Sequence, residues 1–523
     1  MNGTSDSGSD QQRNLRCREA ALEMGAEQFR QAGHLLVDQI GDFLQTLQTA
    51  PSPSESGQPS RPVHPAESVA EVKAALGSAA LPQQGMAAAA LLDETAHLLF
   101  DHSLFNGHPG FMAYVTSSAA PIGALGDLLA SSINANVGAW ALSPMATEIE
   151  KQTVDWIRQA IDCDESYGGL LVSGGTMANF VGFLAARKAQ TDWDIRSQGL
   201  GKSGQSLRLY ASRETHTWLQ KAADLFGLGT DAIVWIDTDD QQKIDSHDLQ
   251  GKIAADREAG LQPFLVIASA GTVSTGAIDP LEAIAEICRA QDLWFHVDGA
   301  YGAFAAMLPE ASSDLRALSS ADSIALDPHK WLYTPLEAGC VLVKDPKHLV
   351  DAFSFHPDYY LFDQDDQQEN SEDQPINFYE YGLQNSRGFR ALKVWLAWRQ
   401  AGREGYIGMI RDDIALAQVL AKKVTQQEEL QLCTQSLSIT TFVYVPRQIP
   451  PALSEIEGRE YLNDLNRELL EQVQATGQVY LSNAMIDGQF VLRACIVNFR
   501  TTLSEVEKLL QVVVDLGRAL EKA

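Results

Sequence analysis

Between residues 123 and 344 the chain alternates stretches of helical apolar spacing with short runs of β-branched and aromatic residues. Short apolar runs of this kind are typical of strands that are buried on both faces. Strands that alternate with helices favour a mostly parallel sheet covered by helices on both sides. We therefore predict an α/β fold whose ligands bind at the carboxyl ends of the strands. The predicted strands are residues 207–210, 232–236, 264–268, 293–297 and 340–343.

The first part of the chain has a different pattern. Within residues 18–47, Phe29, Leu36 and Ile40 belong to a set of apolar positions near helical spacing, which predicts an amphipathic helix. A stretch rich in Pro and Ser at residues 51–65 then breaks the periodicity. Such a composition indicates an extended linker.

Beyond residue 388 the pattern changes again. A helical stretch reaches residue 399, strands are predicted at 439–445 and 491–497, and Thr502 and Glu505 form a predicted capping box before a terminal amphipathic helix. This order predicts a smaller α+β domain. The predicted parts of the chain are a disordered head (1–16), an N-terminal helical segment (17–120), a large α/β domain (121–388) and a small C-terminal α+β domain (389–523).

Composition and charge narrow the class of protein. The chain has 523 residues, 45% of them apolar, which is enough for more than one hydrophobic core. Its 39 basic and 68 acidic side chains give a formal net charge of −29 without a basic stripe, which argues against nucleic-acid and anionic-membrane partners. The six cysteines form no C-x-x-C pair, so we expect reduced thiols and no metal site. With neither a signal-peptide pattern nor a membrane-spanning apolar segment, a cytoplasmic location is expected.

Asp298 and Lys330 are the main candidates for chemistry. Asp298 directly follows the predicted strand at 293–297, and Lys330 lies near the end of a mostly apolar run at 323–331. A lysine and a buried acid on successive segments of an α/β sheet are the two groups that pyridoxal phosphate needs, one for its aldehyde and one for its ring nitrogen. Taken singly, a lysine that extends to solvent and a strand-end acid that caps a turn explain the same residues.

Two further features fit the same ligand. The turn at residues 173–176, which contains Gly175 and Thr176, leads into a predicted helix, so its free N–H groups and the helix dipole can hold a phosphate. His216 follows the predicted strand at 207–210 and can stack on a pyridine ring. The alternative interpretations are an ordinary strand-to-helix turn and a structural histidine.

Two tyrosines flank a segment that is predicted to be a mobile surface loop. Residues 363–374 are crowded with Asp, Glu and Gln and contain almost no apolar side chain. Tyr360 precedes this segment and Tyr379 follows it. A tyrosine at either root could swing over a site as a proton donor, or could only hold the loop against the core.

Together these motifs resemble those of the pyridoxal-phosphate-dependent group II amino-acid decarboxylases, which include aromatic-amino-acid, tyrosine, glutamate and histidine decarboxylases. The resemblance implies the aspartate-aminotransferase-like fold (fold type I) and covers nearly the whole chain from about Phe29. The motifs stand in the order of the family. They are His108-Pro109-Gly110-Phe111-Met112-Ala113-Tyr114, Ser173-Gly174-Gly175-Thr176, His296-Val297-Asp298-Gly299-Ala300-Tyr301 and Asp327-Pro328-His329-Lys330-Trp331.

The resemblance implies how the ring of the cofactor is held. Lys330 would form the Schiff base, and Asp298 would pair with the pyridinium nitrogen. His216 and Ala300 would lie on the two faces of the ring. The implied reaction is decarboxylation of an L-amino acid to the amine and carbon dioxide, through the Schiff base and a quinonoid.

The resemblance also implies the surroundings of the phosphate and of the Schiff base. Gly175, Thr176 and Ser323 would hold the phosphate. Thr272 would lie beside the ring, and His329 would lie next to the Schiff base.

Family members work as tight homodimers whose active sites are built from both chains. Tyr360, or else Tyr379, would match the loop tyrosine that protonates the carbanion. This tyrosine favours decarboxylation over the aldehyde synthases and carbon–carbon lyases that share the scaffold, because a loop without the phenol leaves the carbanion open to oxygen. A catalytically silent α/β binding protein is the third alternative.

For the substrate we expect an aromatic L-amino acid, because Phe111, Tyr114 and Trp140 are placed near the inferred pocket entry. An acidic substrate would need an arginine there. Residues 114–117 stand where aromatic-specific members have a Pro-Thr pair, which leaves the shape of this pocket open. Asp327 stands where an asparagine is frequent near the phosphate, and its negative charge would repel that group unless it is hydrogen-bonded.

Overall fold

The computed structural model describes residues 20–48, 61–77, 80–201, 206–355, 375–447 and 454–521. The predicted head, most of the predicted linker, Tyr360 and the loop at 363–374 lie outside the described residues. By its internal contacts the chain divides into two compact units, Met1–Leu104 and Phe105–Ala523. We describe each unit by itself.

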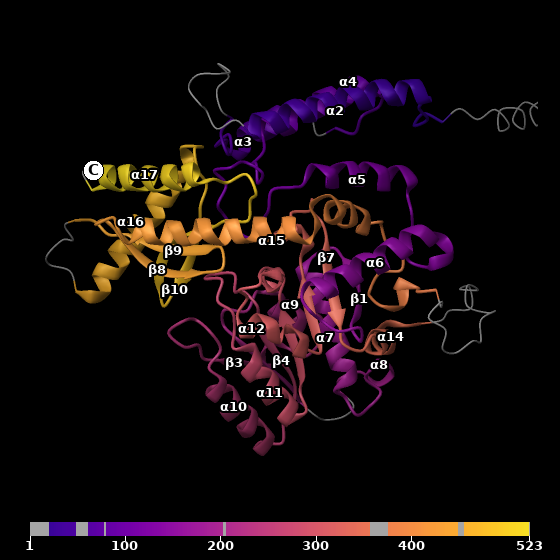
Figure 1. Ribbon diagram of the computed structural model, residues 1–523, viewed down its shortest axis with the longest axis vertical. Coiled ribbons are helices and arrows are strands. Elements are labelled where there is room, and N and C mark those ends of the chain that lie inside the picture. The colour runs from indigo at the N-terminus through magenta and orange to yellow at the C-terminus, as the bar shows by residue number, and fades with distance from the viewer. Residues whose placement is uncertain are drawn as a thin grey trace, which may run out of the picture. The chain divides into compact units, whose positions relative to one another are not determined.

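The first unit is helical. It contains α2 (Ala26–Gln48), α3 (Val69–Leu76) and α4 (Ala88–Asp101), and α2 and α4 lie side by side (Figure 1). Phe43 stacks on Phe100 with ring centroids 4.5 Å apart, so apolar faces hold the pair together. The predicted amphipathic helix is confirmed from Ala26 onward.

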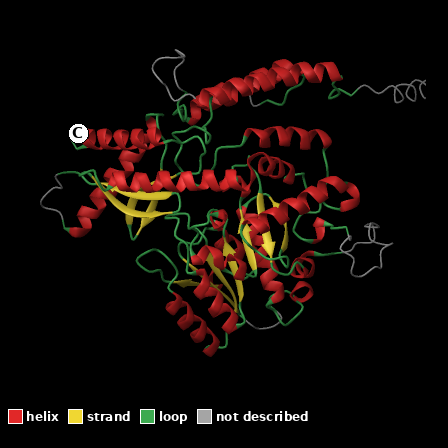
Figure 2. Ribbon diagram, in the orientation of Figure 1, coloured by secondary structure: helices red, strands yellow, loops and turns green. Residues whose placement is uncertain are grey.

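The second unit contains a seven-stranded sheet in the order β1-β7-β6-β5-β4-β2-β3. Figure 2 draws the strands in yellow and the helices in red. Only β7 runs antiparallel to its neighbours in this sheet, which confirms the predicted mostly parallel α/β architecture. All five predicted strands are present. The strands are β1 (Gly168–Val172), β2 (Leu207–Ser212), β3 (Ile233–Ile236), β4 (Gln262–Ser269), β5 (Trp294–Asp298), β6 (Ser323–Leu326) and β7 (Gly339–Val343).

Two strands of this sheet were not predicted. β1 contains two glycines among its five residues, and β6 has only four residues and begins with a serine, so neither resembles a long apolar run. The helices that accompany the sheet are α5 (Pro121–Ile133), α6 (Pro144–Ala160), α7 (Gly175–Ala189), α8 (Ile195–Gln198), α9 (Trp218–Leu225), α10 (Ser246–Glu258), α11 (Leu281–Gln291), α12 (Ser313–Arg316), α13 (Pro328–Trp331) and α14 (Lys347–Phe353). The short 3-10 helices are η1 (Trp140–Leu142), η2 (Thr230–Ala232), η3 (Ala303–Met307), η4 (Ala317–Ser320) and η6 (Phe378–Glu380).

The C-terminal part contains a four-stranded antiparallel sheet in the order β10-β11-β9-β8. The predicted α+β character and the Thr502–Glu505 capping box are confirmed. The predicted helical stretch to residue 399 is the start of a longer helix, in which Gly402 has a positive φ of 67° and makes a kink. The elements are α15 (Ala391–Val424), β8 (Leu430–Ser436), β9 (Ile439–Tyr444), α16 (Glu455–Ala475), β10 (Ser482–Ile486), β11 (Gln489–Cys495) and α17 (Leu503–Leu520).

These two sheets fall within the predicted domains at 121–388 and 389–523 respectively, while the domain boundaries themselves stay predictions.

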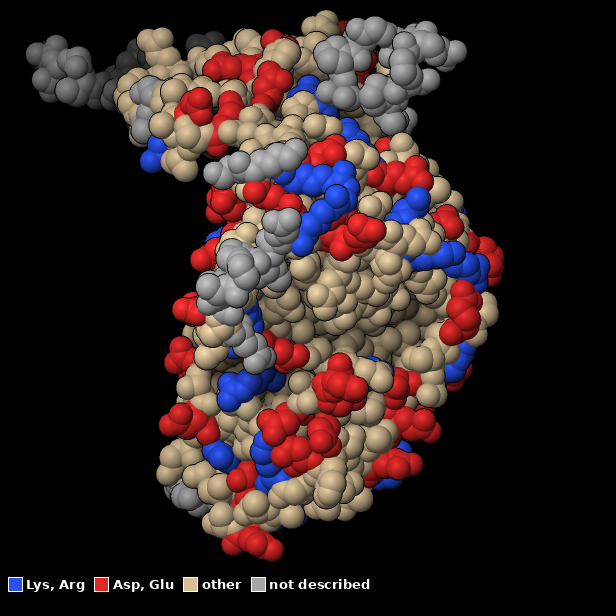
Figure 3. Space-filling model, turned by 90° about the vertical axis from the view of Figure 1, so that its left-hand side faces the viewer, with Lys and Arg blue, Asp and Glu red and all other residues tan. Residues whose placement is uncertain are grey.

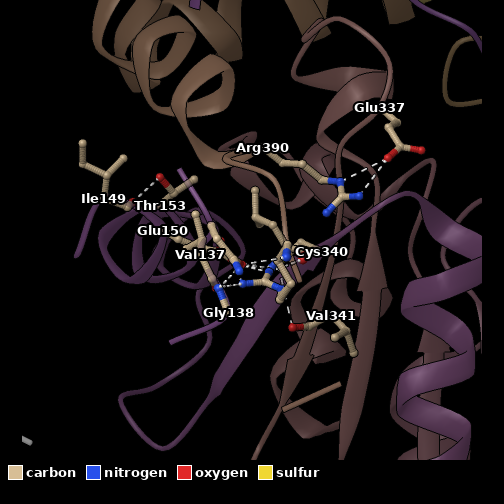
Figure 4. A network of polar contacts seen from close by, with 12 residues as sticks. Val137, Gly138, Ile149, Glu150, Thr153, Glu337, Cys340, Val341 and Arg390 are labelled. Atoms are coloured by element: carbon tan, nitrogen blue, oxygen red, sulfur yellow. Dashed lines mark hydrogen bonds and ion pairs between the residues drawn. The ribbon is translucent and has the colours of Figure 1, made fainter. Parts of the chain in front are cut away.

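A buried ion pair fixes one edge of the larger sheet. Arg387 and Glu150 are both almost fully buried, and the guanidinium also donates to the carbonyl oxygens of Val137 and Leu171. Figure 4 shows Glu150 and Val137 within this network of polar contacts. The pair therefore ties α6 and β1 to the segment before α15.

The surface carries both signs of charge. On the face drawn in Figure 3, lysines and arginines are scattered among more numerous acidic side chains.

Within the described residues, no helix is both long enough and apolar enough to cross a membrane. The same residues contain no group of three His, Cys, Asp or Glu side chains that could hold a metal ion.

Candidate active site

A cavity of about 380 Å³ opens where β5 and β6 end. The two strands are parallel neighbours, with Asp298 at the end of β5 paired with Ala325 on β6. The carboxyl ends of parallel strands meet at one edge of a sheet, so the residues that follow them share a site. Of the residues predicted from the sequence, the cavity is lined by Gly175, Thr176, His216, Thr272, Asp298, Ala300, His329 and Lys330.

Asp298 is fixed by two donors. The indole N–H of Trp218 donates to its Oδ2 at 2.8 Å, and the backbone N–H of Ala300 donates to its Oδ1 at 3.2 Å. The side chain is 9% exposed and still lines the cavity. A carboxylate held in this way is ready to accept a proton-bearing nitrogen.

Lys330 lies on the short helix α13, which follows β6. Its Nζ is 3.1 Å from Oδ2 of Asp327, and Nε2 of His329 is 3.6 Å from the same oxygen. Burial lowers the pKa of His329, so the neutral imidazole is favoured at neutral pH. The lysine therefore stands against a carboxylate inside the cavity and does not extend to solvent.

The glycine turn forms a narrow cradle at the start of α7. A Cβ added to Gly175 would lie 2.7 Å from Oδ2 of Asp327 and 3.1 Å from Cβ of Ala300, so no side chain fits there. On the facing strand, a Cβ added to Gly339 would lie 2.5 Å from Cα of Gly174. These glycines allow close packing and leave the first N–H groups of α7 accessible to an anion.

His216 and Thr272 lie on the cavity wall. Desolvation lowers the pKa of His216, although the charge of Asp298 opposes this effect, and the backbone N–H of Trp218 lies 3.2 Å from its Nδ1. A neutral, flat imidazole suits stacking on a ring. The Thr272 hydroxyl lies 2.9 Å from the Thr275 hydroxyl, which fixes the turn after β4.

The structure corrects the prediction for Ser323. This residue does not line the cavity and is fully buried. Ser323 is the first residue of β6, whereas the cavity lies at the opposite, carboxyl end of that strand. Its hydroxyl accepts from the Trp294 indole at 2.8 Å and lies 2.7 Å from Nδ1 of His296, so it is used within the core.

The three residues predicted for the substrate pocket do not line the cavity either. Phe111 is buried against Tyr480, and the Trp140 indole donates to Glu148 at 2.8 Å. Tyr114 is 52% exposed, and its neighbour Val115 lines the cavity in its place. These sequence predictions placed aromatic residues by their order along the chain, which does not specify which way a loop side chain points.

Tyr379, the alternative loop tyrosine, is buried, and its backbone N–H donates to the Gly138 carbonyl at 2.9 Å. It does not line the cavity. Tyr360 is outside the described residues, so its role stays a prediction.

Comparison with known proteins adds the decisive observation. A family model described as "Pyridoxal-dependent decarboxylase conserved domain" matches residues 71–445. The chain belongs to the pyridoxal-dependent decarboxylase family. Within this family, it is 32% identical to an aromatic-L-amino-acid decarboxylase from Bacillus atrophaeus over 96% of this chain and 97% of the relative.

Another relative of this chain is named for a different activity, aldehyde synthesis. A phenylacetaldehyde synthase from a Rosa hybrid cultivar is 29% identical over 94% of both chains. Among solved structures, Oryza sativa TDC with PLP and tryptamine superposes with a TM-score of 0.84 at 26% identity, covering 96% of this chain and 100% of that one. The fold type I prediction is thereby confirmed, and the chain is a pyridoxal-phosphate-dependent amino-acid decarboxylase.

The cavity fits pyridoxal phosphate. The glycine cradle at α7 suits the phosphate, the fixed carboxylate of Asp298 suits the ring nitrogen, and the amine of Lys330 suits the aldehyde. His216 and Ala300 both line this space.

Sequence reasoning gave no role to Asn179, Glu214 and Tyr301, which line the cavity, or to Trp218, which supports its wall from behind. Trp218 holds Asp298, and Asn179 donates from Nδ2 to the Gly175 carbonyl at 2.8 Å. Glu214 and Tyr301 complete the wall. Trp218 stands two residues after His216 and Asn179 stands one helical turn after Gly175, so their spacing from predicted residues was the available signal.

Proposed function

We propose that this decarboxylase acts on an aromatic L-amino acid and releases the corresponding amine and carbon dioxide. The observation that carries the proposal is the pairing, in one cavity, of an amine on α13 with a fixed carboxylate at the end of β5. When bound, pyridoxal phosphate supplies an aldehyde that takes the substrate amine and a ring that accepts the electrons released with carbon dioxide.

Each wall residue then has a specific task. Lys330 would hold the cofactor through its amine. Asp298 would keep the ring nitrogen protonated, which its two donors favour by fixing the carboxylate in place. His216 and Ala300 would orient the ring, and Thr272 would lie beside it.

An apolar substrate side chain agrees with the chemistry of the wall. Val115, Met177 and Val273 line the cavity, and no arginine is among its described lining residues. Glu214 lines it as well, and burial raises the pKa of that carboxyl. A carboxyl at this place gives an acidic substrate no positive partner, so an acidic side chain is disfavoured in this partly desolvated site.

Tyr360 is proposed to be the acid that protonates the product carbon, which separates amine formation from the aldehyde synthase reaction. The Tyr360→Phe variant should therefore form less amine and more aldehyde and peroxide than the wild-type enzyme. Tyr379→Phe is the matched control and should keep amine as the main product. Equal product ratios in the two variants would assign the proton to another group.

The chain is proposed to form a homodimer through α5. This helix carries a row of apolar side chains that are each between 50% and 61% exposed, namely Leu125, Leu128, Leu129 and Ile133. An exposed apolar row of this kind is typical of a surface that packs against another chain. The family resemblance suggests that a second copy of the chain packs against these side chains.

The described cysteines are all free thiols, which supports a reducing compartment such as the cytoplasm.

Two measurements test this assignment. The purified protein, supplied with pyridoxal phosphate, should release carbon dioxide from aromatic L-amino acids in a panel of the common amino acids. Borohydride should fix the cofactor to the peptide that contains Lys330, as read by mass spectrometry. Activity confined to glutamate or aspartate would overturn the substrate, and an adduct absent from Lys330 would overturn the site.

A further inference from the structure

Asp327 places a buried carboxylate directly beside the glycine cradle. The residue lies between β6 and α13, is 2% exposed and lines the cavity. Its Oδ1 is buried and has no hydrogen-bond partner among the described residues. A buried carboxylate oxygen without a donor costs free energy, so this atom is open to a ligand.

The carboxylate touches the first residues of α7. Its Oδ2 lies 2.7 Å from the position that a Cβ on Gly175 would take, and its Oδ1 lies 4.0 Å from the corresponding position on Gly174. The free N–H groups at this helix start are the binding place for the phosphate. A phosphate held there would lie against the Asp327 carboxylate.

In the cofactor-free protein one cation compensates Asp327. Lys330 Nζ is 3.1 Å from Oδ2, whereas His329, at 3.6 Å from the same oxygen, has a pKa that burial lowers. The other titratable groups that the charge of Asp327 reaches are His216 across the cavity and Cys340 on β7, and neither is a cation at neutral pH. Once the amine of Lys330 is bonded to the cofactor aldehyde, the three N–H donors of its ammonium are no longer available to Asp327.

We propose that binding of the cofactor phosphate takes up one proton, which is shared between Oδ1 of Asp327 and a phosphate oxygen. The balance is simple: a carboxylate, a phosphate dianion and one solvent proton give one O–H···O hydrogen bond, and no covalent bond to carbon or phosphorus changes. Condensation of the lysine ammonium with the aldehyde gives a protonated imine and water, which leaves the proton count of that step unchanged. Two anions in contact cannot both stay unprotonated at low cost.

The sign of the pH dependence follows. Because the bound state holds one more proton than the free partners, cofactor affinity falls as pH rises above the second pKa of the phosphate, about 6. The fall approaches tenfold for each pH unit. The inference rests on the pyridoxal phosphate assignment, which the visible absorbance of the bound cofactor reports separately.

The test compares two ligands on two proteins. Pyridoxal, which lacks the phosphate, shares the aldehyde chemistry with pyridoxal phosphate, so the difference in proton uptake between them isolates the phosphate. Uptake is measured by calorimetry on the cofactor-free full chain in two buffers of different ionisation enthalpy. Wild type should take up about one proton more with pyridoxal phosphate than with pyridoxal, and Asp327→Asn should show no such difference.

Asp327→Asn should also bind pyridoxal phosphate roughly tenfold or more tightly than wild type near pH 8, since the amide offers a donor without a charge. Asp322→Asn is the matched control, because Asp322 is a partly buried carboxylate that accepts from the Phe295 N–H at 2.7 Å and does not line this cavity. It should keep the wild-type proton count. Equal uptake of protons with both ligands on wild type would overturn the proposal even if no variant folds.

Discussion

Asp298 shows how a single residue is made ready for its task. Two donors hold the carboxylate, the Trp218 indole at 2.8 Å and the Ala300 backbone N–H at 3.2 Å, and neither is itself charged. Neither donor forms an ion pair with the carboxylate, which therefore stays available to a ring nitrogen. Its geometry is set before any ligand arrives, which is the condition for electrostatic catalysis.

Asp298→Asn should lower kcat by on the order of a hundredfold or more, because an amide cannot hold the ring nitrogen in its protonated form. Trp218→Phe removes only one donor to the same carboxylate, so we expect a loss of about tenfold. Both are measured as carbon dioxide release at cofactor occupancy matched by absorbance. An Asp298→Asn enzyme with wild-type kcat would contradict the role given to this carboxylate.

His296 makes a pH-dependent contribution from inside the core. The ring is fully buried, with Nδ1 2.7 Å from the Ser323 hydroxyl and Nε2 2.7 Å from Oδ1 of Asn179. Burial lowers the pKa of His296 from 6.5 to about 4, although the charge of Asp298 opposes the shift. The unfolded chain therefore binds more protons than the folded one between these two values.

Because the folded pKa lies below the unfolded one, the stability from neutral His296 is fully present above about pH 6.5 and is lost as pH falls toward about 4. The loss amounts to at most about 3 kcal/mol. Thermal midpoints of the cofactor-free protein between these pH values measure it. His296→Gln should show a shallower fall over the same range, and parallel curves would show that another group dominates.

At the scale of secondary-structure elements, the short helix that carries Lys330 is held in place by hydrogen bonds to a longer helix. Asp413 on α15 is buried, and its Oδ2 accepts from the Trp331 indole at 3.0 Å and from the Tyr333 hydroxyl at 2.7 Å. Trp331 is the last residue of the short helix α13, which carries Lys330, and Tyr333 follows two residues later. A helix of one turn has little stability of its own, so α15 holds the lysine in place.

Asp413→Ala should destabilise the protein by about 2–5 kcal/mol, because it leaves two buried donors without an acceptor. Asp413→Asn keeps an amide oxygen at the same place and should cost about 1 kcal/mol or less. Differential scanning calorimetry of the two cofactor-free variants measures the contrast. Similar midpoints for Ala and Asn would mean that volume, and not the hydrogen bonds, explains the role of Asp413.

For the molecule as a whole, the exposed apolar row on α5 leads to a prediction about assembly. Leu128→Glu combined with Leu129→Glu should convert the proposed dimer to a monomer, since charges cannot be buried in an apolar contact. Amine formation should fall with it, as expected for sites built from two chains. Mass by light scattering is the measurement.

The control for this prediction is Leu225→Glu, at a leucine on α9 that is 66% exposed and does not belong to the row on α5. It should keep the wild-type mass and activity. A double variant that remains dimeric would move the interface to another surface.

The amino-acid sequence determined the mostly parallel α/β architecture, five strands of the larger sheet and the chemistry of the site. Five strand predictions were confirmed because strands covered on both faces have continuous apolar runs. Asp298 and Lys330 could be placed in one site because the segments that carry them end or follow strands, and parallel strands end at one edge. β6 was missed because its four residues include one β-branched residue and no aromatic one, unlike the equally short β3.

Only the tertiary structure decided which side chains face the cavity. Ser323 stands in the same apolar run as Lys330, yet it lies at the amino end of β6, in the core and away from the cavity. Phe111 and Tyr114 lie outside the helices and strands, and Trp140 begins the three-residue 3-10 helix η1, so no period of 2 or 3.6 residues specifies the direction of these side chains. Trp218 and Asp413 act through contacts with residues 80 or more positions away, and such contacts exist only once the chain has folded.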